Sequence, residues 1–202
     1  MPLVLATNNR HKISEYQEIL ADVPLLSLAD FPHMDEVEET ADDFEGNAAL
    51  KAEAVFAHSG QLCLADDSGL CVAALGGAPG VRSARYVPGT DADRLRALLR
   101  AMEGQSDRRA WFVCVIAVAG VPEGLALPPG LVWRGGLVMA RAEVHGQLAL
   151  APRGPGGFGY DPIFELPSGH TTAELPAAEK HAVSHRGQAA RLLRPLMDAL
   201  RI

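Results

Sequence analysis

The stretch Leu62–Leu75, LCLADDSGLCVAAL, places two adjacent aspartates, Asp66 and Asp67, between two apolar runs. The apolar runs are typical of strands, and the Asp-Ser-Gly sequence between them is typical of a turn, because Asp and Ser favour turns and Gly tolerates positive φ. Ionised carboxylates are costly to hold at the edge of a core unless something cationic faces them. The stretch therefore predicts two strands and a turn, whose tip is either a plain hairpin or a site for a cation.

The rest of the chain alternates strand-like and helix-like patterns, which predicts an α/β or α+β fold. We find no repeat and no long linker, and therefore expect one domain spanning residues 1–202. Residues 76–86 and the glycine-rich residues 151–162 are expected to be loops. Expected strands cover 3–7, 25–28, 110–120 and 131–144, the last broken at 135–136; expected helices cover 8–22, 47–60, 90–102 and, apart from Pro176 and Pro195, 173–200.

The composition is that of an ordinary soluble globular protein, with 48% hydrophobic and 21% charged residues among 202. There is no apolar run long enough for a membrane helix and no basic leader of a signal peptide, so we expect no membrane association. Cys63, Cys71 and Cys114 lie in apolar runs without paired spacing, which predicts buried, reduced thiols in a cytoplasmic protein. A net charge of −7 argues against a nucleic-acid partner.

The basic residues are unevenly chosen, with 15 arginines and 3 lysines. Lysine provides a compact point charge that suits phosphate, whereas arginine provides a planar fork. Lys12, Lys51 and Lys180 are therefore candidates for contacts with an anionic ligand.

Two candidate sites lie in the first quarter of the chain. In TNNRHKISE (7–15), a turn leads into a helix whose first N–H groups could hold phosphate together with Lys12, or the segment is simply a capped helix with a Lys12–Glu15 ion pair. Farther on, Asn47 and Lys51 share a helix face behind an acidic loop. One glutamate of that loop, Glu38 or Glu39, together with one of the two aspartates, would supply the few carboxylates that Mg²⁺ needs beside substrate phosphates.

A third candidate lies near the C-terminus. The glycines of GGFGYDP (156–162) allow close backbone approach, and Phe158 and Tyr160 offer flat surfaces to a nucleobase. Lys180, His185 and Arg186 add donors, unless they form a solvated helix face. Ser68 lacks a nucleophile-elbow motif, and the histidines and cysteines lack zinc-site spacing, so neither chemistry is favoured.

Four elements occur together and in order: T-x-N-x-x-K-x-x-E, A-D-D-S-G, F-G-Y-D-P and S-H-R-G. Over residues 3 to about 193 the chain resembles the inosine triphosphate pyrophosphatase family, which removes non-canonical purine nucleotides. The resemblance implies a long mixed central sheet flanked by helices, with two lobes, an active-site cleft between them and a homodimer. It also implies Mg²⁺-dependent hydrolysis of dITP, ITP or XTP to the monophosphate and pyrophosphate.

The resemblance also assigns roles to residues. It implies that Asp67 is the catalytic base and, with Glu38, a magnesium ligand. The expected supporting residues are Glu15, Glu39, Asn47 and Asp66. The expected substrate-binding residues are Thr7, Asn8, Asn9, Arg10, His11, Lys12, Lys51, Ser68, Phe158, Gly159, Tyr160, Asp161, Lys180, His185 and Arg186. The last seven are expected to recognise the base and its 6-oxo group, and Ser68 is expected to lie beside the substrate.

The departures from the family pattern are small. Asn8 replaces a glycine found in many members, Arg82 occupies a position that is often aromatic, and the loop 121–130 is enlarged. Two alternatives stay open: a related pyrophosphatase for other modified bases, such as methylated pyrimidines, and a nucleotide-binding regulator without turnover.

Overall fold

A computed structural model describes residues 2–35 and 37–202 and contains a seven-stranded mixed sheet with the order β2-β1-β3-β4-β6-β5, in which β7 pairs with β6. β1 is parallel to both β2 and β3, whereas β6 is antiparallel to both β5 and β7. The strands are β1 (Leu3–Leu5), β2 (Leu25–Ser27), β3 (Cys63–Val72), β4 (Arg109–Ala119), β5 (Leu131–Arg134), β6 (Leu137–Leu148) and β7 (Phe164–Glu165). The expected mixed α/β class is confirmed.

The chain forms two compact units. Unit 1 comprises Met1–Asp67, Cys114–Ala142 and Arg186–Ile202, and unit 2 comprises Ser68–Val113 and Glu143–His185. The strands β3, β4 and β6 each contribute residues to both units. A single domain over the whole chain remains a prediction.

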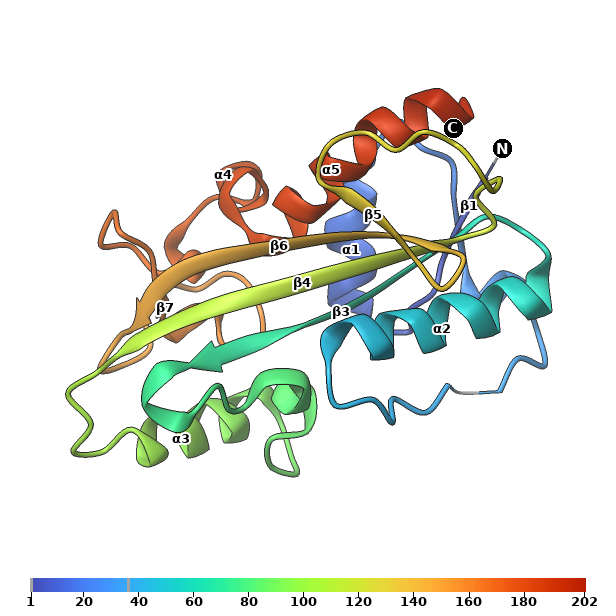
Figure 1. Cartoon of the computed structure of the whole chain (residues 1–202). Coiled ribbons are helices and arrows are strands. Elements are labelled where there is room, and N and C mark those ends of the chain that lie inside the picture. Colours follow the sequence, from blue (N-terminus) through green and yellow to red (C-terminus); the bar gives the residue numbers. More distant parts are fainter. Residues whose placement is uncertain (1, 36) are drawn as a thin grey trace. The chain divides into compact units, whose positions relative to one another are not determined.

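In unit 1, helices cover both faces of the strands. Helices α1 (Arg10–Ile19) and α5 (His185–Leu200) lie on one face, and α2 (Phe44–Ser59) lies on the other (Figure 1). Tyr16 and Leu193 are fully buried in the core under α1 and α5. Helix α2 begins at the N-cap Asp43 and ends, as expected, at Gly60, whose left-handed φ of 63° closes the helix.

Unit 2 has a core of its own around the ends of the long strands. Helix α3 (Asp91–Ala101) starts at the expected N-cap Thr90, and its Leu95 and Leu98 pack in a cluster with Phe112 and Phe164. Helix α4 (Ala177–Val183) and short 3₁₀ helices complete the unit. The 3₁₀ helices of the whole chain are η1 (Leu28–Asp30), η2 (Ala73–Leu75), η3 (Gly80–Arg85), η4 (Asp161–Ile163) and η5 (Thr172–Glu174).

Three expectations about local structure are wrong. The stretch around Asp66 and Asp67 contains no turn, because β3 runs without interruption through both aspartates, each of which has polar partners on its own face. Residues 80–85 form η3 rather than an irregular loop. The C-terminal helix is not broken at Pro195, which lies on the exposed side of α5. The break is at the extended Ser184, a favourable N-cap residue.

Candidate active site

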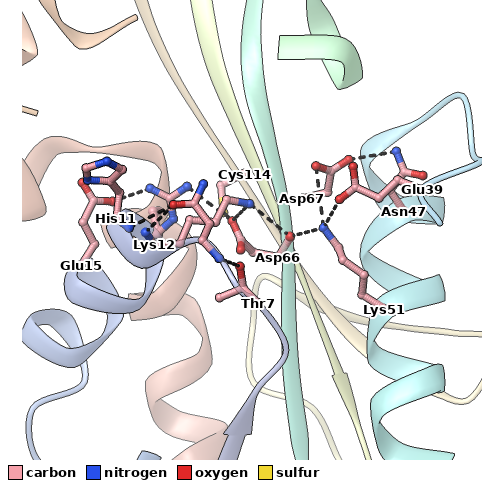
Figure 2. Close-up of polar contacts among 12 residues, drawn as sticks. Thr7, His11, Lys12, Glu15, Glu39, Asn47, Lys51, Asp66, Asp67 and Cys114 are labelled. Carbon is pink, nitrogen blue, oxygen red and sulfur yellow. Dashed lines mark hydrogen bonds and ion pairs between the residues drawn. The ribbon is translucent and has the colours of Figure 1, made fainter. Parts of the chain in front are cut away.

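The two aspartates of β3 point to opposite faces of the strand, as alternation in an extended strand requires. Asp66 faces α1 and Lys12, whereas Asp67 faces α2 and Asn47 (Figure 2). Both are buried, with 1% and 4% exposure. The pair therefore serves two separate groups of side chains in unit 1.

Asp66 contacts three cationic side chains of unit 1. Its Oδ2 lies 3.0 Å from Lys12 Nζ and 3.4 Å from Arg186 Nη2. Its backbone carbonyl oxygen accepts a hydrogen bond of 2.7 Å from Lys51. Burial alone would raise the pKa of Asp66, but Lys12, Arg186 and Lys51 outweigh it and hold the pKa well below its usual range, so this carboxylate is permanently ionised at neutral pH.

Arg186 was expected to recognise the base, and the structure buries it in unit 1 with 2% exposure. Its guanidinium donates to Glu15 and lies 5.9 Å from the ring centroid of Tyr16. Glu15 and Asp66 raise the pKa of Arg186 beyond the lowering effect of burial. Arg186 and Glu15 thus belong to the same network of ion pairs as Asp66. A contact between Arg186 and a base stays a prediction.

Asp67 is held by the side chain of Asn47. Ala41 N–H donates to Asn47 Oδ1 at 2.9 Å, which turns Asn47 Nδ2 towards Asp67 Oδ2 at 3.1 Å. Burial raises the pKa of Asp67, Glu39 adds to this effect, and Lys51 opposes it. Asp67 is therefore a stronger proton acceptor than an ordinary exposed aspartate.

Lys51 links this aspartate to the acidic loop. Its Nζ lies 2.6 Å from Glu39 Oε1 and 4.0 Å from Asp67 Oδ1, and the nearby carboxylates raise its pKa despite burial. Glu38, the predicted magnesium ligand, is exposed next to Glu39. Among residues 2–35 and 37–202, no three histidine, cysteine or acidic side chains are gathered as a metal site, so the Glu38–Asp67 metal pair stays a prediction.

In the turn before α1, side chains already accept hydrogen bonds from several of the backbone N–H groups that the sequence suggests for phosphate. Thr7 Oγ1 accepts from the Asn9 N–H at 3.1 Å, and Asn9 Oδ1 accepts from the N–H groups of His11 and Lys12 at 3.0 and 3.3 Å. A phosphate would have to replace Asn9 as acceptor or bind through side chains. Four members of the predicted set, Asn8, Asn9, Arg10 and His11, are exposed.

Several residues of the glycine-rich loop of unit 2 are held by hydrogen bonds. Asp161 Oδ2 accepts from the Phe158 N–H at 2.8 Å, and Tyr160 donates its hydroxyl to the Ser83 carbonyl at 3.0 Å. Gly157 precedes this segment with φ 72°, and a Cβ there would lie 2.4 Å from the Asp161 carboxylate. The loop conformation therefore requires glycine at this position.

Lys180 joins the same loop. Its Nζ lies 2.7 Å from Asp161 Oδ2 and 5.1 Å from the centroid of the Phe158 ring. Thr172 donates to the other carboxylate oxygen of Asp161 at 2.8 Å. His185 is buried and stacks on Phe112 with ring centroids 4.6 Å apart. Unit 2 thus gathers every residue expected to recognise the base except Arg186.

All three lysines are nearly buried and have similar surroundings. Lys12, Lys51 and Lys180 each expose 13% or less of the side chain, and each contacts a carboxylate. Their contacts with an anionic ligand stay a prediction. Sequence reasoning missed Thr172 and Ser83, whose roles depend on contacts between segments far apart in the chain.

The fold and both clusters define a class of α/β protein with lysines and carboxylates suited to a phosphorylated ligand. A sequence model of the Ham1 family matches residues 3–196, and the chain belongs to this family. It is 49% identical over 189 residues, 93% of this chain and 90% of the relative, to a dITP/XTP pyrophosphatase of Symbiobacterium thermophilum. It is 46% identical over 199 residues, 98% and 95% of the two chains, to a dITP/XTP pyrophosphatase of Parasynechococcus marenigrum.

Solved structures agree with this placement. A HAM1 protein from Coxiella burnetii superimposes with a TM-score of 0.84 at 40% identity, and the Staphylococcus aureus Ham1 protein superimposes with the same score at 36% identity. Each comparison covers 98% of this chain and 99% of the other. The predicted family and fold are confirmed.

Proposed function

We propose that the chain hydrolyses non-canonical purine nucleoside triphosphates, namely dITP, ITP and XTP, to the monophosphate and pyrophosphate. The observation that carries the proposal is Asp67, a buried carboxylate with a raised pKa, held by Asn47 and next to Lys51. Relatives named dITP/XTP pyrophosphatases support the substrate class.

In this mechanism Asp67 accepts the proton of the water that attacks the α-phosphorus. Its Oδ2 accepts from Asn47, and its Oδ1, on the side of Lys51, would take the proton of the water. Lys12 and Lys51 offset negative charge that develops on the pyrophosphate leaving group. Their contacts with Asp66 keep both ammonium groups in place without substrate.

The proposed cofactor is Mg²⁺, held by Glu38 and Asp67. Carboxylate oxygens suit this ion, which takes few protein ligands and fills its remaining positions with water and substrate phosphates. The ion, when bound, supplies further charge neutralisation at the phosphates. A rise in the Tm of the protein on adding MgCl₂, lost in both Glu38→Gln and Asp67→Asn, would test these ligands without an activity assay.

Base selectivity is assigned to unit 2. The ring of Phe158 offers a flat surface, and Lys180 and His185 provide donors for a 6-oxo group. A site that aims buried donors at this group rejects adenine, because the amine of adenine leaves those donors unpaired.

We also propose a cytoplasmic homodimer that binds no nucleic acid. The buried free cysteines support a reducing compartment, and the net charge of −7 supports the absence of nucleic-acid binding. Within the described part of the chain, none of the helices has the length and apolarity to cross a membrane.

The test is incubation with dITP, XTP, dGTP and dATP in the presence of Mg²⁺, with pyrophosphate and phosphate assayed separately. We expect pyrophosphate from dITP and XTP and little turnover of dGTP and dATP. Release of single phosphates, or no preference among these bases, contradicts the proposal. Preferred turnover of methylated pyrimidine nucleotides would favour the related pyrophosphatase, and binding without turnover would favour the regulator.

A further inference from the structure

The loop that contains Phe158 and Tyr160 is held by a hydrogen bond to a residue outside the F-G-Y-D-P motif. Asp91, the first residue of α3, accepts the Gly159 N–H on its Oδ2 at 2.8 Å. The two residues lie 68 positions apart in the chain and both belong to unit 2. The bond therefore connects the start of α3 to the centre of the predicted base-recognition loop.

The carboxylate of Asp91 is itself oriented. Arg94 Nη2 donates to Asp91 Oδ1 at 2.5 Å, and Arg94 Nη1 donates to the Gly89 carbonyl at 2.8 Å. One carboxylate oxygen thus faces Arg94 while the other faces the loop. Because hydrogen bonds to an ionised acceptor are about twice as strong as neutral ones, this bond is a firm restraint on Gly159.

An acidic residue at the start of a helix often serves only the helix itself. In α3 that task belongs to Asp93, which accepts from the N–H and hydroxyl of Thr90 at 2.8 and 2.7 Å in a capping box. Asp91 has its side chain directed to another segment instead. The two aspartates, two positions apart, therefore form a natural pair of test and control.

We propose that Asp91 is a positioning residue for base selectivity: through the Gly159 N–H it fixes the backbone between Phe158 and Tyr160, and so the surface offered to the purine. The inference rests on the proposed function. Ser83 holds Tyr160 through its hydroxyl, and Asp161 holds the Phe158 N–H, so Asp91 adds a restraint on the backbone between these two residues. Loss of Asp91 loosens the loop without removing any group assigned to chemistry.

The experiment compares Asp91→Ala, Asp91→Asn and Asp93→Asn with the wild type, measuring kcat and KM for dITP and dATP. We expect Asp91→Ala to raise KM for dITP about tenfold, to change kcat less than about twofold, and to reduce the preference for dITP over dATP. Asp91→Asn keeps an oxygen that can accept from Gly159 and should recover most of the loss. Asp93→Asn should behave as wild type.

Asp91 exposes 42% of its side chain, so the variants should fold, which circular dichroism checks. Unchanged KM and selectivity in Asp91→Ala overturn the inference, and so do equal losses in Asp91→Ala and Asp93→Asn, because these would indicate damage to α3 alone. A wild type without preference for dITP contradicts the proposed function itself, and this result is obtained before any variant is compared.

Discussion

Unit 1 and unit 2 each contain a nearly buried lysine–aspartate pair. The two pairs differ in the other partners of the aspartate oxygens. Lys12 and Asp66 lie 3.0 Å apart, and Lys180 and Asp161 lie 2.7 Å apart. In unit 2, both carboxylate oxygens of Asp161 accept hydrogen bonds. In unit 1, Asp66 Oδ2 meets two cations, while Oδ1 has no hydrogen-bond partner among the described residues.

This difference shows how one chain can separate two tasks. In unit 2 the charges satisfy one another and fix the shape of a loop, which suits recognition of a rigid base. In unit 1 Lys12, Lys51 and Arg186 converge on one aspartate, which fixes the positions of cations that we propose to contact an anionic ligand. The predictions below test this contrast.

The largest expected effect is that of Asp67→Asn. The amide cannot take a proton from water, so kcat for dITP should fall by about 10³-fold or more. The fold should remain, because the amide is isosteric and burial disfavours the charge of Asp67. Steady-state kinetics and circular dichroism check both statements, and near-normal turnover would refute the role of Asp67 as base.

Lys12→Ala should weaken binding of the triphosphate more than binding of the monophosphate product. We expect losses of about tenfold or more for the triphosphate, because Lys12 is assigned to the phosphates that leave as pyrophosphate. Calorimetric titration of inactive Asp67→Asn protein, with and without Lys12→Ala, separates binding from turnover. Equal losses for both ligands would contradict the phosphate assignment.

Replacement of the two lysines by methionine compares the units directly. Lys180→Met leaves Asp161 buried with neutral donors and should lower the free energy of unfolding by about 3 kcal/mol. Lys12→Met should cost about 1–2 kcal/mol, because Arg186 and Lys51 still neutralise Asp66. Urea denaturation measures both values, and the reverse order would contradict the contrast between the units.

Near neutral pH the smallest effect is that of the thiols. Burial raises the pKa of Cys63 to about 12, whereas an unfolded thiol titrates near 8.5. The native protein keeps a proton that the unfolded chain loses, so this thiol adds stability that is fully present below about pH 8.5 and declines as pH rises towards 12, by up to about 1.4 kcal/mol per pH unit.

Ellman's reagent at pH 8 should therefore leave the native cysteines unmodified and react with all three after denaturation. In intermediate urea, the order in which Cys71 of unit 2 and Cys63 of unit 1 react should show which unit opens first. Rapid modification of Cys63 in the native protein would contradict its burial.

Local chemistry made much of the fold predictable. The strands at the N-terminus and in residues 110–120, the cap at Thr90 and the end of α2 at Gly60 follow from short-range patterns. The course of β3 was not predictable in this way, because Asp-Ser-Gly favours a turn locally. Its continuity depends on partners that approach Asp66 from α1 and α5, far away in sequence, and Asp67 from the preceding helix α2.

The sequence by itself determined the family, the α/β class and the chemical types at the site, because motifs and residue choice record which groups are present. Only the tertiary structure decided that Asp66 and Asp67 face opposite sides of one strand, that Arg186 lies buried against Glu15 and Asp66, and that Asp91 supports Gly159. The physical reason is that burial and hydrogen bonding depend on distances between segments, which no local pattern contains.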